Sequence, residues 1–331
     1  MINRRTFVRA LSAALAGTAL PTFAQAPGRT YKVGVLRPTS PPKTKERLVG
    51  EVLLPAALAK RGYVEGRNLA IEWRYAEGSV QRLPGFAQEL VDKKTDVIVA
   101  VAGSSVQAAM QATSRIPIVF FGNFDPVATK YVASLGRPGR NVTGVLIAPE
   151  GTLAVKKLEI LMQAVPGARR IAVLAPGDDS ILAIQLPELR QAAGALGIEL
   201  EIVKIRGTDY EEGFARMANT RPDALFLLPN TYFMVDRRRV IDLATHHRVP
   251  GIWEWREQAE EGGLMAYGSS LTERYDRIAE YVARIFKGAN PGEMPVDQPT
   301  RFPLVINLKT AKAIGHTIPQ SLLVRADEVI Q

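Results

Sequence analysis

The feature that most constrains this chain is a regular alternation of short apolar runs with amphipathic segments. Residues 96–101 and 116–121 are almost continuously apolar, which is typical of strands buried on both faces of a parallel sheet. Segments of a dozen or so residues with helical spacing, such as 80–93, lie between such runs. Strands that alternate with helices in this way predict doubly wound α/β sheets.

The chain is long enough for two such sheets, because its 331 residues compare with roughly 150 for a typical domain. We expect strands over 31–36, 69–75, 96–101, 116–121, 142–146, 170–174, 198–203, 224–228, 249–253 and 263–267. We expect helices over 43–61, 80–93, 104–114, 152–164, 183–195, 210–219, 233–246 and 271–286, then a proline-rich segment over 290–303 and a last strand and helix over 304–314.

The order of these elements predicts an α/β protein with two parallel-sheet lobes. We assign residues 27–147 with about 272–300 to the first lobe, and residues 148–271 with about 301–331 to the second. The tail after residue 286 is expected to cross between the lobes.

The N-terminus has the form of an export signal. Arg4, Arg5 and Arg9 precede an apolar stretch over 10–23, and residues 24–26 form a small-x-small peptidase site. Cleavage after Ala24 is an alternative to cleavage after Ala26, and the paired arginines also resemble a twin-arginine signal. We therefore predict a periplasmic protein, without a lipid anchor because there is no cysteine to carry one.

Composition excludes several classes of function. The chain has no cysteine and three histidines, which excludes thiolate metal sites and iron-sulfur clusters and leaves little for metal binding. Removal of the export signal would lower the formal charge from +9 to +6, since that segment holds three arginines. Basic residues are interleaved with acids, and the run 237–239 lies between aspartates, so we predict a solvated helix face and no nucleic-acid partner.

Common catalytic motifs are missing from the sequence. It contains no Gly-x-Ser-x-Gly elbow, no phosphate loop, no His-Glu-x-x-His and no Gly-x-Gly-x-x-Gly after the first strand. Glu254 and Glu257 could form an acid pair for glycoside chemistry, although nothing in the sequence fixes their separation. We predict a protein that is not an enzyme and has no cofactor or metal.

Candidate binding residues follow the ends of the predicted strands, where open α/β sheets hold their ligands. Arg37 ends the first strand, and Trp253 and Trp255 alternate at the end of a later one. The residues that we predict to contact the ligand are Thr39, Ser104, Ser105, Asp125, Asn230, Trp253, Glu254 and Tyr267.

These residues suggest distinct roles in holding a small polar molecule. Helix N–H groups and Ser105 would hold a carboxylate, Asp125 or Glu254 an ammonium group, and Trp253 with Tyr267 an apolar or aromatic body. Simpler interpretations stay open: Ser104 or Ser105 could only cap a helix, Asp125 could form a turn, and the tryptophans could lie in the core.

The sequence also resembles a family of ABC transporter substrate-binding proteins that includes the tryptophan- and tyrosine-type binding proteins. The resemblance covers nearly the whole mature chain. It rests on IPIVFF at 116–121, DPV at 125–127, SLGRPGRNVTG at 134–144, DALFLLP at 223–229, EGGLMAYG at 261–268, PTRF at 299–302, VINLKTAK at 305–312, and IP, LL and RAD between 318 and 327.

The resemblance implies a type I periplasmic-binding fold, in which two α/β lobes are joined by several crossings and close over a ligand. It also implies an inner-membrane permease with its ATPase as partners. Ser104, Ser105, Asn230, Trp253 and Tyr267 match the cleft loops of relatives that bind aromatic amino acids. This chain departs from many relatives at residues 37–39, Arg-Pro-Thr, and at 102–105, Ala-Gly-Ser-Ser, where they carry Gly-Thr-Pro-type or Gly-Ser-Pro-type sequences.

We therefore predict a monomeric periplasmic component of an ABC importer that captures an amino acid, an aromatic one included, or a related carboxylate. A ligand-sensing module for a receptor, an exported α/β enzyme and a sugar-binding protein are the alternatives.

Overall fold

The computed structural model describes residues 29–41, 49–147, 152–177, 179–228 and 230–331. Contacts divide the chain into residues 1–30 and residues 31–331, and both sheets belong to the second unit. The predicted export signal lies outside the described residues.

The first sheet has five parallel strands in the order β2-β1-β3-β4-β5. Its strands are β1 Tyr31–Arg37, β2 Leu69–Tyr75, β3 Val97–Val101, β4 Ile118–Gly122 and β5 Val142–Leu146. The helices between them are α2 Val49–Ala59, η1 Val80–Arg82, α3 Leu83–Asp92 and α4 Gly103–Ala112. The predicted strands of this half are confirmed, because their continuous apolar runs are buried by helices on both faces.

The second sheet has seven strands in the order β12-β11-β10-β9-β8-β6-β7. Its strands are β6 Arg170–Pro176, β7 Glu199–Ile205, β8 Ala224–Leu227, β9 Gly251–Trp253, β10 Met265–Tyr267, β11 Leu304–Asn307 and β12 Glu328–Ile330. The helices of this part of the chain are α5 Thr152–Ala164, α6 Asp179–Ala195, α7 Tyr210–Thr220, α8 Thr231–Val235, α9 Arg237–His246, α10 Arg256–Glu260, α12 Leu308–Ile314 and α13 Gln320–Leu323.

The second sheet departs from the prediction in three places. The expected helix over 233–246 is two helices, α8 and α9, that meet at Asp236. The short elements α13 and β12 were not expected from the sequence. One pairing is antiparallel, that of β11 with β10, whereas all the others are parallel.

The antiparallel pairing follows from the path of the chain. After β10 the chain passes to the first sheet as α11, Leu271–Phe286, and η2, Pro291–Glu293, and then returns to form β11. Because β10 ends at the edge where the chain leaves and β11 begins where it comes back, the two neighbours run in opposite directions. No βαβ crossover joins them to impose a parallel direction.

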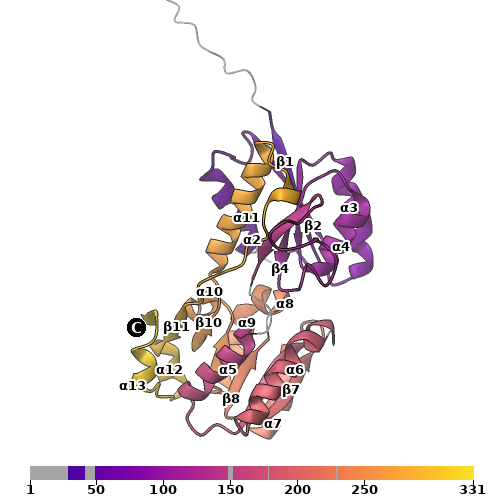
Figure 1. Cartoon of the computed structure of the whole chain (residues 1–331). Helices are drawn as coiled ribbons and strands as arrows, with labels where there is room; N and C mark the ends of the chain where they lie inside the picture. The colour runs from indigo at the N-terminus through magenta and orange to yellow at the C-terminus, as the bar shows by residue number, and fades with distance from the viewer. Residues whose placement is uncertain (1–28, 42–48, 148–151, 178, 229) are drawn as a thin grey trace, which may run out of the picture. The chain divides into compact units, whose positions relative to one another are not determined.

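Helix α11 covers the first sheet although it follows the last parallel strand of the second. It contacts α2 extensively and also β4 and β5, and Figure 1 shows it lying beside α2. Its buried face includes Leu271, Tyr275, Ile278 and Val282, which join Val33 and Val35 of β1 in one apolar cluster. Burial of four large side chains at about 1.5–3 kcal/mol each stabilises this docking.

The chain passes between the two sheets three times: after β5, after β10 and before β11. Hydrogen bonds connect these three crossings to one another. The Ser269 hydroxyl donates to the carbonyl of Ile147 at 2.8 Å, which links the second crossing to the first. The backbone of Asp297, at the start of the third crossing, bonds to Gly144 and Leu146 at 2.9 and 2.8 Å. All three crossings therefore pass through one region next to the end of β5.

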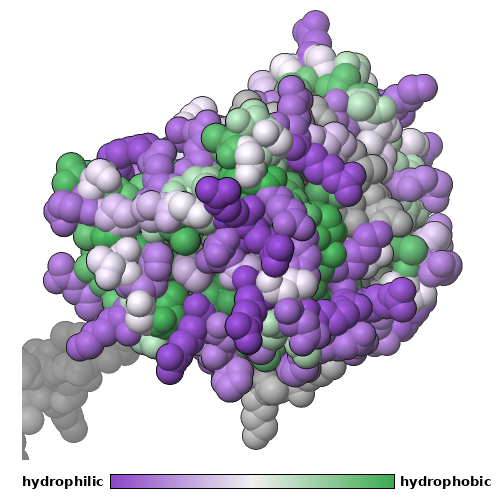
Figure 2. All heavy atoms as spheres, turned by 90° about the horizontal axis from the view of Figure 1, so that it is seen from below, coloured by the Kyte–Doolittle hydropathy of each residue, from purple (hydrophilic) through white to green (hydrophobic). Residues whose placement is uncertain are grey.

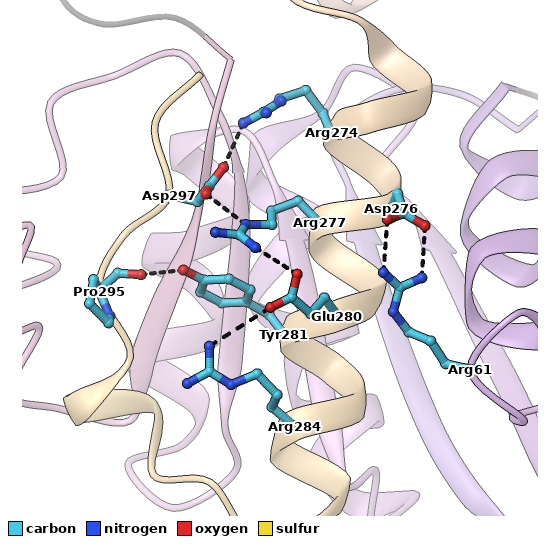
Figure 3. A network of polar contacts seen from close by, with 9 residues as sticks. All are labelled: Arg61, Arg274, Asp276, Arg277, Glu280, Tyr281, Arg284, Pro295 and Asp297. Carbon is cyan, nitrogen blue, oxygen red and sulfur yellow. Dashed lines mark hydrogen bonds and ion pairs between the residues drawn. The ribbon is translucent and has the colours of Figure 1, made fainter. Parts of the chain in front are cut away.

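The side chain of Asp297 fixes the third crossing to α11 (Figure 3). Its two carboxylate oxygens accept from Arg274 at 2.6 Å and from Arg277 at 2.7 Å, and the side chain is 11% exposed. The Tyr281 hydroxyl donates to the carbonyl of Pro295 one turn further along. Asp297 thus bridges two arginines of α11, and Glu280 is a second carboxylate partner of Arg277 at 2.6 Å.

We expect Asp297→Asn to lower the free energy of unfolding by about 2–4 kcal/mol, because it leaves the guanidinium of Arg274 without a carboxylate and leaves Arg277 with Glu280 alone. Urea unfolding followed by circular dichroism measures the change. Asp242→Asn is the matched control, because Asp242 is an exposed residue of α9. Equal unfolding midpoints for the two variants would contradict this account of the crossing.

Candidate ligand-binding site

The strand orders define where each sheet can hold a ligand. In the first sheet β2 and β3 lie on opposite sides of β1, and in the second β7 and β8 lie on opposite sides of β6. Helices that leave neighbouring strands in opposite directions open a crevice at the carboxyl ends. In the first sheet this crevice lies between Arg37, the end of β1, and Gly103, which follows β3. In the second sheet it lies between the ends of β6 and β8, and Asn230 follows β8.

Thr39 and Ser105, at the first of these crevices, have the properties of ligand-binding residues. Both side chains are completely buried, yet neither hydroxyl oxygen has a hydrogen-bond partner in the protein. Buried polar groups in folded proteins are nearly always bonded, and an unbonded one costs about 1–3 kcal/mol. Two such hydroxyls at the carboxyl edge of one sheet therefore indicate a missing partner.

Helix α4 begins at a strained residue beside these hydroxyls. Ala102 has φ 68° and ψ 157°, a region that residues other than glycine rarely adopt and that concentrates at functional sites. Its N–H donates to Phe121 at 2.8 Å, so β4 holds it in place. The first turn of α4 thereby starts directly at the end of β3.

The interpretation of Ser104 or Ser105 as a helix cap is wrong. The N-cap position is Ala102, which has no capping side chain, and both serines lie inside the first turn. Ser104 is half-buried and Ser105 is buried. The helix N-terminus therefore keeps its partial positive charge without a protein acceptor from the cap residue.

Arg37 is the main residue that the predicted contacts omitted. It is 5% exposed, and its Nε and Nη1 atoms have no hydrogen-bond partner. A methyl group on Gly50 would lie 2.7 Å from Nη1 and 2.3 Å from the Tyr275 hydroxyl, so α2 and α11 enclose the guanidinium. The sequence did carry a signal for Arg37, since it is a charged residue at the end of a largely apolar strand.

Tyr75, which pairs with Arg37 in the sheet register, has a raised pKa. The Tyr75 hydroxyl donates to Glu51, and burial first, then this hydrogen bond, raises the pKa of Tyr75 while the charge of Arg37 lowers it. The Trp73 and Tyr75 rings lie nearly parallel with centroids 6.3 Å apart. The neutral hydroxyl of Tyr75 thus lies near the cation of Arg37.

Glu254 forms a buried ion pair that the sequence did not indicate. Lys157 of α5 donates to its Oε2 atom at 2.9 Å and to the carbonyl of Leu227 at 3.0 Å, and it lies 4.9 Å from the centre of the Phe226 ring. The two side chains are 1% and 4% exposed. Lys157 was missed because a lysine on an amphipathic helix ordinarily faces water. The other oxygen of Glu254, Oε1, is buried without a partner.

The remaining predicted residues have structural roles in this conformation. Asp125 accepts from the N–H groups of Val127 and Ala128 at 2.7 and 2.9 Å, the turn that the sequence left as an alternative. Asn230 caps α8 by accepting from Tyr232 at 2.7 Å. Tyr267 is half-buried, with its ring centroid 6.2 Å from that of Phe302.

Of the two tryptophans, Trp253 lies in the core. It is 1% exposed and belongs to the apolar cluster on one face of the second sheet. A methyl group on Gly263 would lie 2.7 Å from its ring, and the ring lines a cavity with Ile241 and Thr310 under α9 and α12. Trp253 is therefore a core residue in this structure, which is one of the two interpretations that the sequence left open.

Trp255 and Tyr232 instead reach the first sheet. Trp255 belongs to the apolar cluster that α2 and α11 form on that sheet, as does Met234 of α8. The Tyr232 hydroxyl lies 3.5 Å from the carbonyl of Pro38, next to Thr39. The aromatic residues that follow β8 and β9 thus meet the residues that follow β1.

Glu257 stands apart from Glu254. One oxygen accepts from the N–H and hydroxyl of Thr272 at 3.3 Å, while the other is buried without a partner. Burial raises the pKa of Glu257, more than these bonds lower it. With one glutamate bound to Lys157 and the other at the start of α11, each has its own structural partner.

Two further features bear on function. Within the described ranges, no three histidine or acidic residues are grouped as metal ligands would be, and no helix is long and apolar enough to cross a bilayer. In the arginine run 237–239, Arg238 and Arg239 are exposed as the prediction of a solvated face requires, whereas the side chain of Arg237 is only 16% exposed and pairs with Glu261. Figure 2 shows hydrophilic and hydrophobic side chains interspersed on the face seen from below.

Solved structures identify the fold. A conserved domain protein of Vibrio cholerae is 27% identical, with a TM-score of 0.78 over 91% of this chain and 100% of that one. An ABC domain from Streptococcus pneumonia in complex with L-Trp is 24% identical, with a TM-score of 0.75 over 91% of this chain and 100% of that one. The two sheets form the type I fold of periplasmic solute-binding proteins.

The chain belongs to the family of ABC transporter substrate-binding proteins. The model of that family matches residues 32–330. A tyrosine-binding protein of Clostridioides difficile is 26% identical over 260 residues, which cover 78% of this chain and 74% of that protein. The family binds small-molecule ligands for transport, as the resemblance in the sequence implied.

We expect Lys157→Met to lower the free energy of unfolding by about 3–5 kcal/mol, because it leaves the buried carboxylate of Glu254 without a counterion. Chemical denaturation measures the change. Lys156→Met is the control, since exposed Lys156 pairs with Glu159 on the surface and should cost less than about 1 kcal/mol. The double variant Lys157→Met/Glu254→Leu should be more stable than Lys157→Met alone, and additive losses would refute the pairing.

We expect Glu257→Gln to change how stability depends on pH. The pKa of Glu257 in the folded state lies above its ordinary value of 4.5, so the folded protein binds this proton more tightly and loses stability as pH rises through the folded pKa. The variant lacks this loss. Its stability relative to the unsubstituted protein should increase as pH rises above 4.5, as urea titrations at a series of pH values would measure.

Glu188→Gln is the control for this comparison, because Glu188 is exposed on α6. A stability difference between Glu257→Gln and the unsubstituted protein that stays constant over the same pH range would show that Glu257 is not perturbed.

Proposed function

We propose that this protein is the exported solute-binding component of an ABC importer and that it captures an amino acid, an aromatic one included, or a related carboxylate. The tyrosine-binding relative and the L-Trp complex support this ligand class by analogy. The ligand would lie between residues after β1 and β3 of the first sheet and residues after β8 and β9 of the second.

The observation that carries the proposal is the pair of buried, unpartnered hydroxyls of Thr39, two residues after β1, and Ser105, in the first turn of α4. A carboxylate fits there, since hydroxyls and helix N–H groups donate hydrogen bonds and the helix dipole favours negative charge. Trp255 and Tyr232, which meet the first sheet, would supply aromatic surface for the rest of the ligand. The strained Ala102 holds this helix terminus in position.

The proposed mechanism is capture by domain closure, with no bond made or broken and hence no enzymatic activity. A ligand that touches both lobes stabilises the closed state only by its higher affinity for that state. The closed form would then dock on an inner-membrane permease coupled to an ATPase. The basic, apolar N-terminus supports export to the periplasm, where one monomer would bind one ligand.

A thermal-shift screen tests this function. The purified protein is unfolded and refolded to remove bound solute, then heated with amino acids, aromatic acids, sugars and nucleosides. A ligand that binds only the folded state raises the melting temperature by mass action. We expect a rise only with amino acids or carboxylates, and a rise only with sugars or nucleosides, or none at all, would refute the proposed ligand class.

We expect Ser105→Ala to weaken binding of the best ligand about 10- to 100-fold, because a hydrogen bond to a charged group contributes about 1.5–3 kcal/mol. Calorimetric titration measures the affinity. Ser321→Ala is the control, since Ser321 is exposed on α13. Unchanged affinity in Ser105→Ala would remove α4 from the site.

A further inference from the structure

Arg37 is a buried cation without a counterion. It is 5% exposed, two of its three nitrogens lack hydrogen-bond partners, and no ion pair joins it to an acid in the described part of the chain. Buried charges in proteins are ordinarily paired, because an unpaired one loses its hydration without compensation. A guanidinium cannot shed its proton to escape this cost.

The groups that enclose Arg37 leave it charged and oriented. Gly50 allows Nη1 and the Tyr275 hydroxyl to approach α2, as the clash of an added methyl group shows. Glu51 accepts a hydrogen bond from the Tyr75 hydroxyl. The arginine is therefore built into the wall of the first lobe at the end of β1, two residues before Thr39.

Both acids among the predicted contacts already accept hydrogen bonds within the protein. Glu254 already pairs with Lys157 at 2.9 Å, and Asp125 accepts from two backbone N–H groups. Among the buried charged side chains of the described residues, Arg37, Lys157 and Glu254, Arg37 alone has no ion-pair partner, so these three groups together carry one net positive charge. A zwitterionic amino acid would add an ammonium group near this excess positive charge, whereas an organic acid without one would balance it.

We propose that the ligand of this protein binds as a net anion, with a carboxylate paired to Arg37, and that the site selects aromatic carboxylates over the corresponding amino acids. This inference rests on the proposed function, because it assumes a carboxylate-bearing solute at the strand ends. It narrows the ligand from amino acids and related acids to acids without an ammonium group. A planar carboxylate matches the guanidinium of Arg37 better than a neutral ligand does.

Three compounds with the same ring test the charge of the ligand. L-tyrosine carries both groups, 3-(4-hydroxyphenyl)propionate only the carboxylate, and tyramine only the ammonium. By calorimetric titration of the refolded full chain we expect the propionate to bind at least about tenfold more tightly than L-tyrosine, and tyramine not to bind. L-tryptophan, indole-3-propionate and tryptamine repeat the comparison with a larger ring.

Variants of Arg37 test the residue itself. Arg37→Gln should weaken binding of the acid at least about tenfold, and Arg37→Lys should keep part of the affinity. Arg37→Gln should also leave the melting temperature of the ligand-free protein unchanged or higher, since it removes an unpaired buried charge. Arg216→Gln is the control, because Arg216 lies on the surface of α7.

The outcomes separate this inference from the proposed function. Tighter binding of L-tyrosine or L-tryptophan than of the matching acids would overturn the inference and leave the proposed function standing. Equal acid affinity in Arg37→Gln and Arg216→Gln would also overturn it. Failure of every amino acid and every acid in both series to bind would overturn the proposed function and the inference together.

Discussion

The return of the chain to the first sheet is the constraint on which the rest of the structure depends. Helix α11 follows β6 to β10 along the sequence, yet it buries its apolar face against α2 and β1 of the first lobe. Asp297 then fixes the third crossing, because its carboxylate accepts hydrogen bonds from Arg274 and Arg277 while its backbone bonds to Gly144 and Leu146. Because both α11 and the third crossing are bound to the first sheet, the first lobe is complete only when residues far apart in sequence are in contact.

The candidate site lowers the stability of the folded protein, because it buries polar and charged groups without partners. The wall that holds Arg37 is built from β1, α2 and α11, and the hydroxyls of Thr39 and Ser105 are buried without partners. A core designed for stability alone would pair or remove such groups. Their presence at the strand ends, beside the strained Ala102, is understandable when a ligand completes the hydrogen bonding.

Much of the fold could be predicted from local pattern, and the exceptions have physical causes. Apolar runs such as β3 and β4 are confirmed because burial on both faces leaves a strong signal. The strand β11 was expected at the start of residues 304–314, but its antiparallel direction was missed because that direction depends on where the chain re-enters the sheet. In the site, Lys157 and Arg37 were missed as contacts because neither their burial nor their partners can be read from neighbouring residues.

The sequence by itself determined two α/β sheets, their parallel strands and the family, because periodicity and family motifs are local along the chain. It also placed Thr39 and Ser105 at strand ends. Only the tertiary structure decided that Trp253 packs in the core while Trp255 reaches the other sheet, and that Glu254 is neutralised and Arg37 is not. Burial and charge balance depend on groups brought together from distant segments, which a linear pattern does not specify.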